Sequence, residues 1–350
     1  MKVEIVIGAR PNVMKAVPLY REFLKCSSVK LVQTGQHDPD FLAPFFRQFG
    51  LDSSSMEAVE PPTTRERSAR LGEMVSNLSK RFVVTRPDLV VVVGDVDSTL
   101  AAALAAKYAG IRLAHVEAGL RSGDSRMPEE LNRRAVDAFS DLKFVSEPSG
   151  LTNLDSEGLE KGVFLVGNVM IDTLKSFEKE FTEKRAFEQY GLSQHEYVLM
   201  TLHRPELVCN EALFKRTLER IANAVPKPIL WPTHPRINSE FVSKLGFRVI
   251  PPVPYLEMLS LVTDSCFVLT DSGGLQEETS VLSVPCITVR NNTERPVTIT
   301  KGTNQLIGEN CDFLENALLN VGVVRKNVKI DLWDGYAASR IREIVERELK

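Results

Sequence analysis

The sequence predicts an α/β protein made of two Rossmann-like, doubly wound domains. Short runs of apolar, β-branched residues alternate with helical patterns along the whole chain, the order typical of parallel sheets covered by helices. The strand-like runs fall into two successive sets along the chain, each with helical patterns between its strands. The chain has 350 residues, more than one average hydrophobic core accommodates, so the two sets are expected to form two domains.

The N-terminal set consists of continuous apolar runs that end at a glycine or a polar residue, as buried parallel strands do. The runs are residues 4–8, 30–35, 88–94, 113–117, 143–146 and 163–167. Of the helical patterns between them, residues 98–110 (STLAAALAAKYAG) are rich in alanine and stop at Gly110. That composition favours a helix with a glycine after its last turn.

The second set of strands comprises residues 197–202, 228–233, 247–250, 266–270 and 285–289. Amphipathic stretches such as residues 211–225 separate them. A polar helical stretch lies between the two sets, and we place the domain boundary before it, at Gly167–Asn168. The expected N-terminal domain is residues 1–168 with the charged terminal helix, 336–350, and the expected C-terminal domain is residues 169–335.

Composition excludes several classes of function. The formal net charge is −3, so no basic field favours nucleic acid or an anionic membrane, and no apolar run is long enough to cross a bilayer. The start, MKVEIVIG, is typical of a first strand rather than a signal peptide, which predicts a cytoplasmic protein. The five cysteines lack the spacing of a zinc site, and Cys266 and Cys286 lie in strand-like runs, as buried reduced thiols do.

In such sheets, ligands bind beyond the carboxyl ends of the strands, so we expect the two domains to face each other across a cleft lined by strand-end residues. After the first strand, GARPNVMK (8–15) brings Arg10 and Lys15 to a helix start, where backbone N–H groups already favour anions. A phosphate or carboxylate contact is one interpretation, and a solvated basic turn is the other. The stretch is not a GxGxxG fingerprint, so no nicotinamide or flavin dinucleotide is indicated.

Acidic residues follow two neighbouring strands. Asp95 comes after four valines and a glycine, where an acid is costly unless it is paired or faces a cleft. Asp97 could cap the next helix or, with Asp95, hold Mg²⁺, although no third ligand is evident. Glu117 ends the next strand, on the same face as His115 by strict alternation.

Two further glutamates follow Pro128. Glu129 and Glu130 favour a helix N-terminus, and one of them is expected to serve the helix alone. Asp95, Glu117 and the other glutamate of this pair form a candidate proton-transfer set.

The second half repeats the pattern with basic residues and glycines. His203 follows its first strand and His234 its second. In TDSGGLQEE (270–278), the glycine pair lets the backbone approach a ligand at a helix start, while Ser272 adds a hydroxyl. This is suited to a diphosphate, and Glu278 is placed to accept ribose hydroxyls.

These motifs, taken in order, resemble those of the non-hydrolysing UDP-N-acetylglucosamine 2-epimerases. The resemblance extends from Lys2 to about Arg342 and is carried by GARPNVMK, TGQH, GDVDST, HVEAGLRS, MPEELNR, LHRPE, THP, TDSGGLQEE, TERP and GTNQLIG. It implies a two-domain GT-B fold, interconversion of UDP-GlcNAc and UDP-ManNAc, and a homodimer. It implies no cofactor, metal, nucleic acid or membrane partner.

The resemblance also implies roles for individual residues. The catalytic positions match Asp95, Glu117, Glu129 and His203. The UDP-sugar contacts match Arg10, Lys15, His234, Ser272, Gly273, Gly274, Glu278 and Arg295. In bacterial members, a region that matches Gln36, His37 and Arg70 binds a second UDP-GlcNAc as an activator. Departures from the pattern are Asp38, Pro39, Leu207 and Val297.

Several alternatives share the same fold and nucleotide cradle. They are a 2-epimerase of a modified UDP-GlcNAc (a uronic acid or diamino sugar), a hydrolysing relative, a GT-B glycosyltransferase and an inactive nucleotide-sugar sensor. The carboxylates of the first domain favour epimerisation over transfer, because a transferase usually needs one base.

Overall fold

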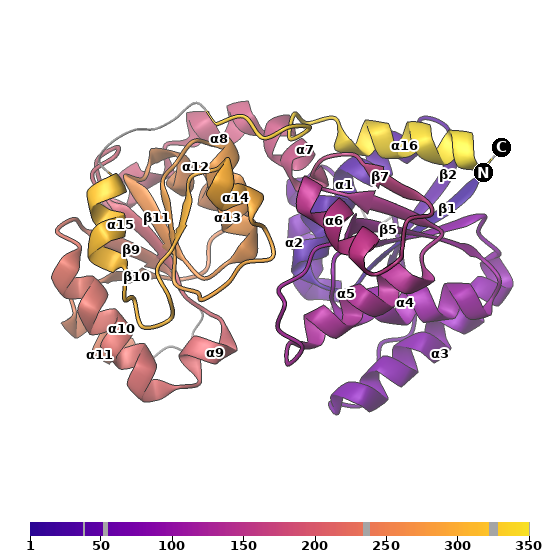
Figure 1. Ribbon diagram of the computed structural model, residues 1–350, viewed down its shortest axis with the longest axis horizontal. Coiled ribbons are helices and arrows are strands. Elements are labelled where there is room, and N and C mark those ends of the chain that lie inside the picture. The colour runs from indigo at the N-terminus through magenta and orange to yellow at the C-terminus, as the bar shows by residue number, and fades with distance from the viewer. Residues whose placement is uncertain (38, 52–54, 234–238, 322–327, 350) are drawn as a thin grey trace. The chain divides into compact units, whose positions relative to one another are not determined.

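A computed structural model describes residues 1–37, 39–51, 55–233, 239–321 and 328–349. It divides the chain into an N-terminal unit, Met1–Ser176 with Asp331–Lys350, and a C-terminal unit, Phe177–Ile330 (Figure 1). The boundary between the two units therefore lies after Ser176, whereas the sequence predicted it at Gly167–Asn168. The reason is that helix α7 (Val169–Ser176) packs against α1 (Arg10–Phe23), and the Thr173 hydroxyl donates a hydrogen bond to the Met14 carbonyl.

In the described part of the chain, the N-terminal unit has a seven-stranded sheet in the order β3-β2-β1-β4-β5-β6-β7, with parallel pairing throughout. The strands are β1 (Lys2–Ile7), β2 (Ser28–Gln33), β3 (Met56–Ala58), β4 (Leu89–Val93), β5 (Arg112–Ala118), β6 (Leu142–Val145) and β7 (Val163–Leu165). Besides α1 and α7, the helices are α2 (Pro39–Gln48), α3 (Arg67–Thr85), α4 (Asp97–Tyr108), α5 (Pro128–Phe139), α6 (Pro148–Ser156) and α16 (Ala337–Glu348).

The C-terminal unit has a six-stranded parallel sheet in the order β10-β9-β8-β11-β12-β13. Its strands are β8 (Val198–Thr201), β9 (Ile229–Pro232), β10 (Arg248–Ile250), β11 (Phe267–Thr270), β12 (Cys286–Thr288) and β13 (Asn304–Leu306). The helical segments are α8 (Glu178–Lys184), η2 (Ala186–Tyr190), α9 (Pro205–Val208), α10 (Glu211–Ala224), α11 (Ser239–Lys244), α12 (Tyr255–Asp264), α13 (Gly273–Val281), α14 (Val297–Thr300) and α15 (Leu314–Val321).

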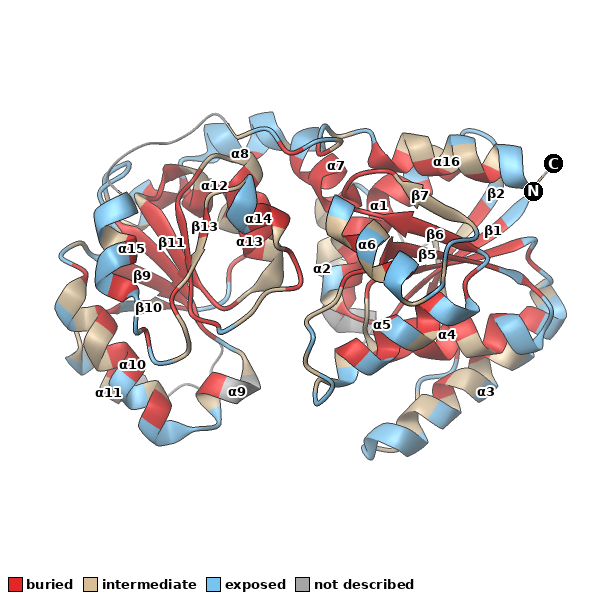
Figure 2. Ribbon diagram, in the orientation of Figure 1, coloured by how far each residue is buried: buried red, intermediate tan, exposed pale blue. Residues whose placement is uncertain are grey.

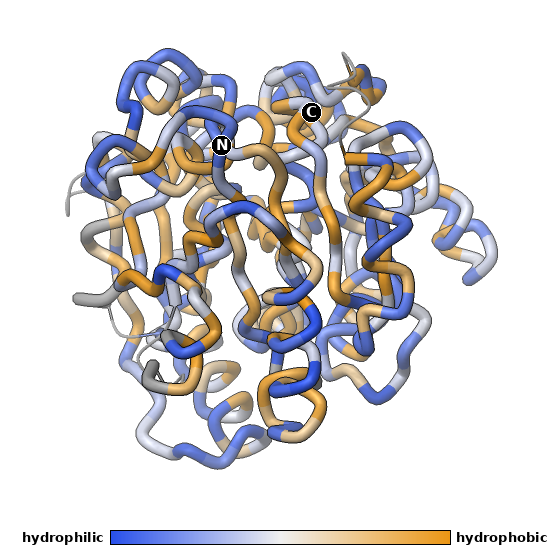
Figure 3. Tube along the Cα trace, turned by 90° about the vertical axis from the view of Figure 1, so that its left-hand side faces the viewer, coloured by the Kyte–Doolittle hydropathy of each residue, from blue (hydrophilic) through white to orange (hydrophobic). Residues whose placement is uncertain are grey.

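Each unit buries its own hydrophobic core between the sheet and the covering helices (Figure 2). All five residues of β4 are buried, and the alanines of α4 pack over them because their small side chains let the helix approach the sheet. In the C-terminal unit, Trp231 is fully buried and makes edge contacts with Phe214 and Phe247 at ring-centroid distances of 6.2 and 6.1 Å. In Figure 3, hydrophobic residues run along the inner strands, while hydrophilic residues predominate in the outer turns.

The sheet orders locate the points where the strand order reverses, which is where α/β sheets bind ligands. In the N-terminal unit the reversal lies between β1 and β4, and in the C-terminal unit between β8 and β11. Arg10, Asp95, His203 and Ser272 follow these four strands in the chain, and Glu117 lies near the end of β5. Within the described residues, no helix combines the length and apolar character needed to cross a bilayer.

Asp172 of α7 fixes the returning C-terminal helix to the N-terminal unit. Its carboxylate accepts hydrogen bonds from the backbone N–H groups of Ala337 (3.1 Å) and Ala338 (2.7 Å), at the start of α16. Burial raises the pKa of Asp172 to about 6, because desolvation outweighs these two hydrogen bonds. The helix is therefore held by a carboxyl group that resists ionisation.

This raised pKa gives a stability prediction with a definite sign. Below about pH 4, Asp172 is protonated in both the folded and unfolded states, and above about pH 6 the folded state must bury the charge. The free energy of unfolding of wild type, relative to Asp172→Asn, is expected to fall by up to about 3 kcal/mol between pH 4 and 7. Urea unfolding of both proteins across this range measures the difference, and a difference that does not vary with pH would contradict the assignment.

Candidate active site

The turn after β1 connects helix α1 to the end of β4. The Asn12 side chain accepts hydrogen bonds from the N–H groups of Gly8 and Ala9, and it donates to the Val93 carbonyl at 2.8 Å. Arg10 begins α1, with its guanidinium 4.5 Å from the centre of the Phe45 ring. Sequence analysis missed Asn12, because an uncharged residue inside a helical pattern gives no signal of such a link.

Lys15 and Glu117 form a buried ion pair beneath this turn. The Lys15 Nζ lies 2.5 Å from Glu117 Oε2, and both side chains are at least nine-tenths buried. Glu117 Oε1 is buried as well and has no hydrogen-bond partner among the described residues. A Cβ built on Gly94, at the end of β4, would lie 3.5 Å from Glu117 Oε2, so the exits of β1, β4 and β5 meet here. The site thus contains a buried carboxylate with one oxygen that has no hydrogen-bond partner among the described residues.

Glu117 occupies a bulge rather than a regular strand position. Its φ is +72°, and the pairing of β5 with β6 shifts register between Val116 and Ala118. The expected common face for His115 and Glu117 is therefore wrong. His115 is bonded to Asp137 of α5, whereas Glu117 is bonded to Lys15 of α1. A left-handed conformation at a residue other than glycine costs about 1–3 kcal/mol, and such strain clusters at functional sites.

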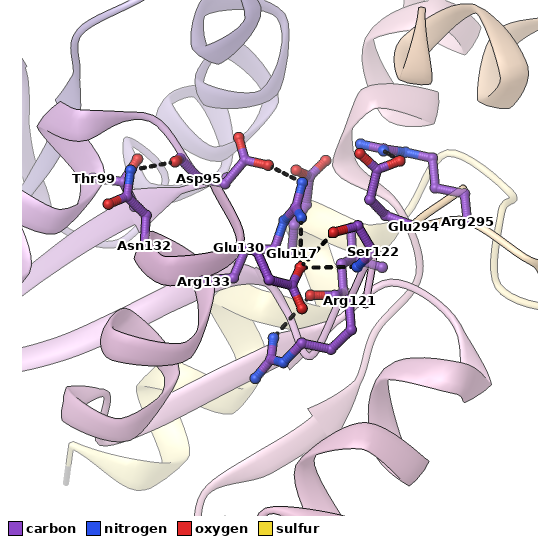
Figure 4. Close-up of polar contacts among 12 residues, drawn as sticks. Asp95, Thr99, Glu117, Arg121, Ser122, Glu130, Asn132, Arg133, Glu294 and Arg295 are labelled. Carbon is purple, nitrogen blue, oxygen red and sulfur yellow. Dashed lines mark hydrogen bonds and ion pairs between the residues drawn. The ribbon is translucent and has the colours of Figure 1, made fainter. Parts of the chain in front are cut away.

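Arg133 holds the Asp95 side chain at the end of β4. Its guanidinium lies 2.5 Å from Asp95 Oδ2 and 3.0 Å from Glu130 Oε2 (Figure 4). Glu130 also accepts hydrogen bonds from the N–H and hydroxyl of Ser122. Glu130 therefore stabilises the loop before α5 and serves the fold, as was expected of one glutamate of the pair.

Glu129 is the other glutamate of the pair. It lies in the first turn of α5 and is half-buried. No hydrogen bond or ion pair of its side chain is found among the described residues, and its charge acts on Arg67. The first turns of α5 reach the end of β4, because Asn132 donates a hydrogen bond to the Asp95 carbonyl at 2.8 Å. Glu129 thus stands on an element that contacts the Asp95 loop.

Asp97 does not cap α4, whose N-cap residue is Val96, and it contacts side chains of α3 and α5 instead. Its carboxylate is bonded to Arg67 and to Asn132, with Arg70 3.4 Å away. Burial would raise its pKa, but the contacts with Arg67, Asn132 and Arg70 together outweigh burial and hold the pKa below its usual range. Among the described residues, no group of three or more His, Cys, Asp or Glu side chains has the arrangement of a metal site.

The three residues matched to the activator region lie around the start of α4. Gln36 Oε1 accepts a hydrogen bond from the Ser98 N–H at 2.9 Å, and His37 Nδ1 accepts one from the Arg10 N–H at 3.4 Å. Burial lowers the pKa of His37, and the cation of Arg70 lowers it further. This region therefore touches both the β1 exit and the β4 exit. Asp38 lies outside the described residues.

In the C-terminal unit, Asp271 orients His203. The Asp271 carboxylate accepts hydrogen bonds from the N–H groups of His203 (2.7 Å) and Arg204 (2.8 Å), and its Oδ1 lies 2.9 Å from His203 Nδ1. Burial would raise the Asp271 pKa, but the interaction with His203 outweighs it and lowers the pKa. The imidazole itself is exposed. Sequence analysis missed this role, although an acid directly after a buried strand was the signal that identified Asp95.

Helix α13 presents its N-terminus next to an anchored arginine. Ser272 is the N-cap residue, and its hydroxyl makes no capping hydrogen bond. Arg295 lies 2.5 Å from Glu277 Oε1 and 3.5 Å from Glu294 Oε2, and Gly273 leaves room for it. Glu278 is buried and accepts a hydrogen bond from the Tyr255 hydroxyl at 2.7 Å. Gly274 is the second residue of the helix, and His234 lies outside the described residues.

The contact at Gly273 yields a prediction about nucleotide binding. A Cβ on this residue would lie 2.7 Å from Arg295 Nη1, and the ion pair with Glu277 limits how far the arginine moves away. Gly273→Ala is expected to weaken UDP binding at least about tenfold, equivalent to about 1.4 kcal/mol. Isothermal titration with UDP measures the change. The control is Gly72→Ala, where an added Cβ meets nothing within 4 Å. Wild-type affinity in Gly273→Ala would contradict the role of this contact.

Comparison with known proteins identifies the family of this chain. The family model described as UDP-N-acetylglucosamine 2-epimerase matches residues 24–346. A UDP-N-acetylglucosamine 2-epimerase of Methanocaldococcus jannaschii is 36% identical over 364 residues, covering 99% of both chains. A UDP-2,3-diacetamido-2,3-dideoxy-D-glucuronate 2-epimerase of Pseudomonas aeruginosa is 35% identical and covers 99% of this chain and 100% of its own.

Solved structures lead to the same family. The M. jannaschii UDP-GlcNAc 2-epimerase in complex with UDP-GlcNAc and UDP superposes with a TM-score of 0.87 at 33% identity, covering 99% of this chain and 100% of that one. A glycotransferase of kitacinnamycin shares the fold alone, at 14% identity and a TM-score of 0.63. The family match over most of the sequence and the relatives of full length together show that this chain belongs to the UDP-N-acetylglucosamine 2-epimerase family.

Proposed function

We propose that this chain interconverts UDP-GlcNAc and UDP-ManNAc by eliminating UDP to give a 2-acetamidoglucal and then adding UDP back. The observation that carries the proposal is Glu117, a buried carboxylate with one oxygen paired to Lys15 and the other without a partner among the described residues. It lies beside the β4 exit that bears Asp95. Named relatives of full length catalyse 2-epimerisation of UDP-sugars, which supports the same reaction here.

The chemistry explains why UDP must leave. The C2 proton of an N-acetylhexosamine has no adjacent carbonyl, so a carbanion at C2 would have no stabilising group. If the C1–O bond breaks as the proton is removed, the electron pair forms the C1–C2 double bond and the negative charge ends on the diphosphate. Addition of a proton to the opposite face of C2, with return of UDP to C1, completes the epimerisation.

We assign the leaving diphosphate to the C-terminal unit. The Ser272 hydroxyl, the backbone N–H groups at the start of α13 and the Arg295 guanidinium are the donors that an anion recruits. His203, exposed and oriented by Asp271, is placed to donate to a phosphate oxygen as charge develops. Arg10, Lys15, His234 and Glu278 remain proposed UDP-sugar contacts by their match to the family motifs.

We assign the two proton transfers to the N-terminal unit. Opposite faces of C2 require two acid/base groups or one that moves. Glu117, Asp95 and Glu129 meet this requirement with carboxylates from three different elements. Lys15 and Arg133 balance the charges of Glu117 and Asp95. No cofactor takes part in this scheme, because elimination and re-addition exchange only a proton and UDP.

The test is to incubate the pure protein with UDP-GlcNAc in D₂O and to follow the anomeric proton by NMR. UDP-ManNAc is expected to form without an acceptor, with deuterium at C2 in both product and recovered substrate. Retention of the original C2 hydrogen throughout would refute elimination. Transfer that occurs only with an added acceptor would indicate a glycosyltransferase instead.

One comparison supports a second candidate substrate, a diacetamido UDP-glucuronate. The P. aeruginosa 2-epimerase of a diacetamido glucuronate is about as similar to this chain as the M. jannaschii enzyme. A panel containing UDP-GlcNAc and that uronate, compared by kcat/KM, separates the two. Deuterium incorporation is expected with either substrate, because both reactions invert C2.

We also propose that the chain forms a homodimer. Support comes from apolar side chains at the ends of the neighbouring helices α3 and α4, where Val83, Val84 and Tyr108 are 66%, 83% and 90% exposed. Light scattering is expected to give twice the 39.1 kDa of one chain, and Val84→Glu with Tyr108→Glu to lower that mass. A wild-type mass of 39.1 kDa would contradict the proposal.

A further inference from the structure

His115 is a buried residue that the proposed reaction does not use. It lies in β5 with 0% exposure, and both of its ring nitrogens contact polar groups. Nδ1 lies 2.6 Å from Asp137 Oδ1, and Nε2 lies 2.9 Å from the carbonyl oxygen of Gly94. The imidazole therefore connects the end of β4 to helix α5.

Both neighbours of the ring are acceptors, which determines where its hydrogens are. A carbonyl oxygen only accepts, so Nε2 must donate to Gly94. Asp137 Oδ2 already accepts hydrogen bonds from the Gly119 N–H at 3.0 Å and from Arg121 at 2.8 Å, as expected of a carboxylate. Burial would raise the Asp137 pKa, but the contacts with His115, Arg121 and the Gly119 N–H together outweigh burial and lower the pKa. Nδ1 must then donate to Asp137, and His115 carries a hydrogen on each nitrogen.

The same contacts fix the backbone on both sides of the candidate carboxylates. The Gly94 carbonyl belongs to the same peptide unit as the Asp95 N–H, and the Gly94 N–H is bonded to the Val116 carbonyl at 3.0 Å. Asp137 holds the Gly119 N–H, two residues after Glu117. Gly94, Glu117 and Gly119 all have positive φ, at +71°, +72° and +80°. The two glycines adopt this conformation without strain, but the left-handed backbone of Glu117 persists only where surrounding contacts determine it, and His115 with Asp137 supplies contacts on both sides of it.

We propose that His115 and Asp137 are a pair of positioning residues, with a doubly protonated imidazole that sets the backbone carrying Asp95 and Glu117. Neither residue is required to touch the substrate. The pair acts by holding the Gly94–Asp95 peptide with one nitrogen and, through Asp137, the end of the Glu117 bulge with the other. The proposal rests on the proposed function, because it assigns the pair to the carboxylates that would carry out the proton transfers.

Two variants test the contacts of the two ring nitrogens of His115 one at a time. In His115→Asn the amide nitrogen replaces Nδ1, so the contact to Asp137 is kept and the Gly94 carbonyl loses its donor. In His115→Gln the amide nitrogen replaces Nε2 and keeps the Gly94 contact. We expect His115→Asn to lower kcat about 100-fold, with KM and the UDP dissociation constant within about twofold of wild type. His115→Gln is expected to recover at least about tenfold of that loss.

The control is Glu4→Gln. Glu4 is a buried carboxylate of β1 paired with Arg81 of α3, so its loss tests general destabilisation. It is expected to lower Tm and leave kcat unchanged. The proposal is overturned if His115→Asn keeps wild-type kcat, or if its kcat and UDP affinity fall together in proportion to Tm, as a purely structural role requires.

The hydrogens on the His115 ring can also be measured directly in wild type. This measurement depends neither on catalytic activity nor on whether the variants fold. With ¹⁵N-labelled histidine, long-range ¹H–¹⁵N correlation at pH 7.5 is expected to show one of the rings with a hydrogen on both nitrogens, assigned by its absence in either His115 variant. A neutral His115 ring with one bare nitrogen overturns the proposal. If wild type does not epimerise UDP-GlcNAc, the proposed function fails, and the ring nitrogens still decide whether this pair exists.

Discussion

Glu117→Gln is expected to epimerise UDP-GlcNAc about 10³-fold more slowly than wild type and to bind UDP within about threefold of wild-type affinity. The substitution replaces a carboxylate by an amide of the same shape, which removes the ability to take or give a proton. A positioned acid or base contributes about 10²–10⁴-fold to a rate, so a loss of this size corresponds to one such group. UDP affinity is expected to persist because the diphosphate is assigned to the C-terminal unit.

The structure explains why this variant should still fold. The amide oxygen of glutamine can accept the hydrogen bond of Lys15, which keeps the contact to Oε2 although Lys15 loses its counter-charge, and Oε1 has no partner among the described residues to lose. Asp172→Asn is the matched control, because it also replaces a buried carboxylate of the N-terminal unit by an amide, away from the ends of β4 and β5. Its kcat is expected to be that of wild type.

Single-turnover rates and UDP titrations of the two variants complete the test. The assignment of Glu117 is contradicted if Glu117→Gln retains more than about a tenth of the wild-type rate. It is also contradicted if UDP affinity falls as far as the rate, since the effect would then be on binding. Deuterium exchange at C2 is expected to slow in parallel with epimerisation, because both begin with removal of the same proton.

The features that sequence analysis predicted are those encoded locally. The valines of β4 and the alanines of α4 specify a fully buried strand and a closely packed helix, and the structure has both. Asp95 was identified because an acid directly after such a strand needs a partner or a ligand. These inferences succeed because burial on both faces of a parallel strand depends on neighbouring residues alone.

The features that were missed depend on residues distant in sequence. The bulge at Glu117 is held by Asp137, which lies on the following helix, so strict alternation gave the wrong face for this residue. Arg133 resembles a solvated helix residue until α5 is packed against the end of β4, where it meets Asp95. The Asn12 amide likewise gains its role only when α1 and β4 become neighbours. A single sequence specifies these residue types but not the pairing between elements.

Asp271→Asn is also expected to have a large effect and to lower kcat about 10²–10³-fold. The Asp271 carboxylate accepts hydrogen bonds from two consecutive backbone N–H groups and lies beside His203 Nδ1. An asparagine offers one acceptor and one donor, so its NH₂ group must face either a backbone N–H or the imidazole. In both cases His203 loses the carboxylate contact that fixes the orientation of its ring.

A double-mutant cycle shows whether Asp271 acts through His203. If it does, adding Asp271→Asn to His203→Ala is expected to cause little further loss of kcat, because the group that Asp271 orients is already absent. Asp264→Asn is the matched control, a buried acid of the same unit that accepts a hydrogen bond from Gln194 at 2.8 Å. Fully additive losses of kcat would instead show that Asp271 supports the β11 exit as a whole, independently of His203.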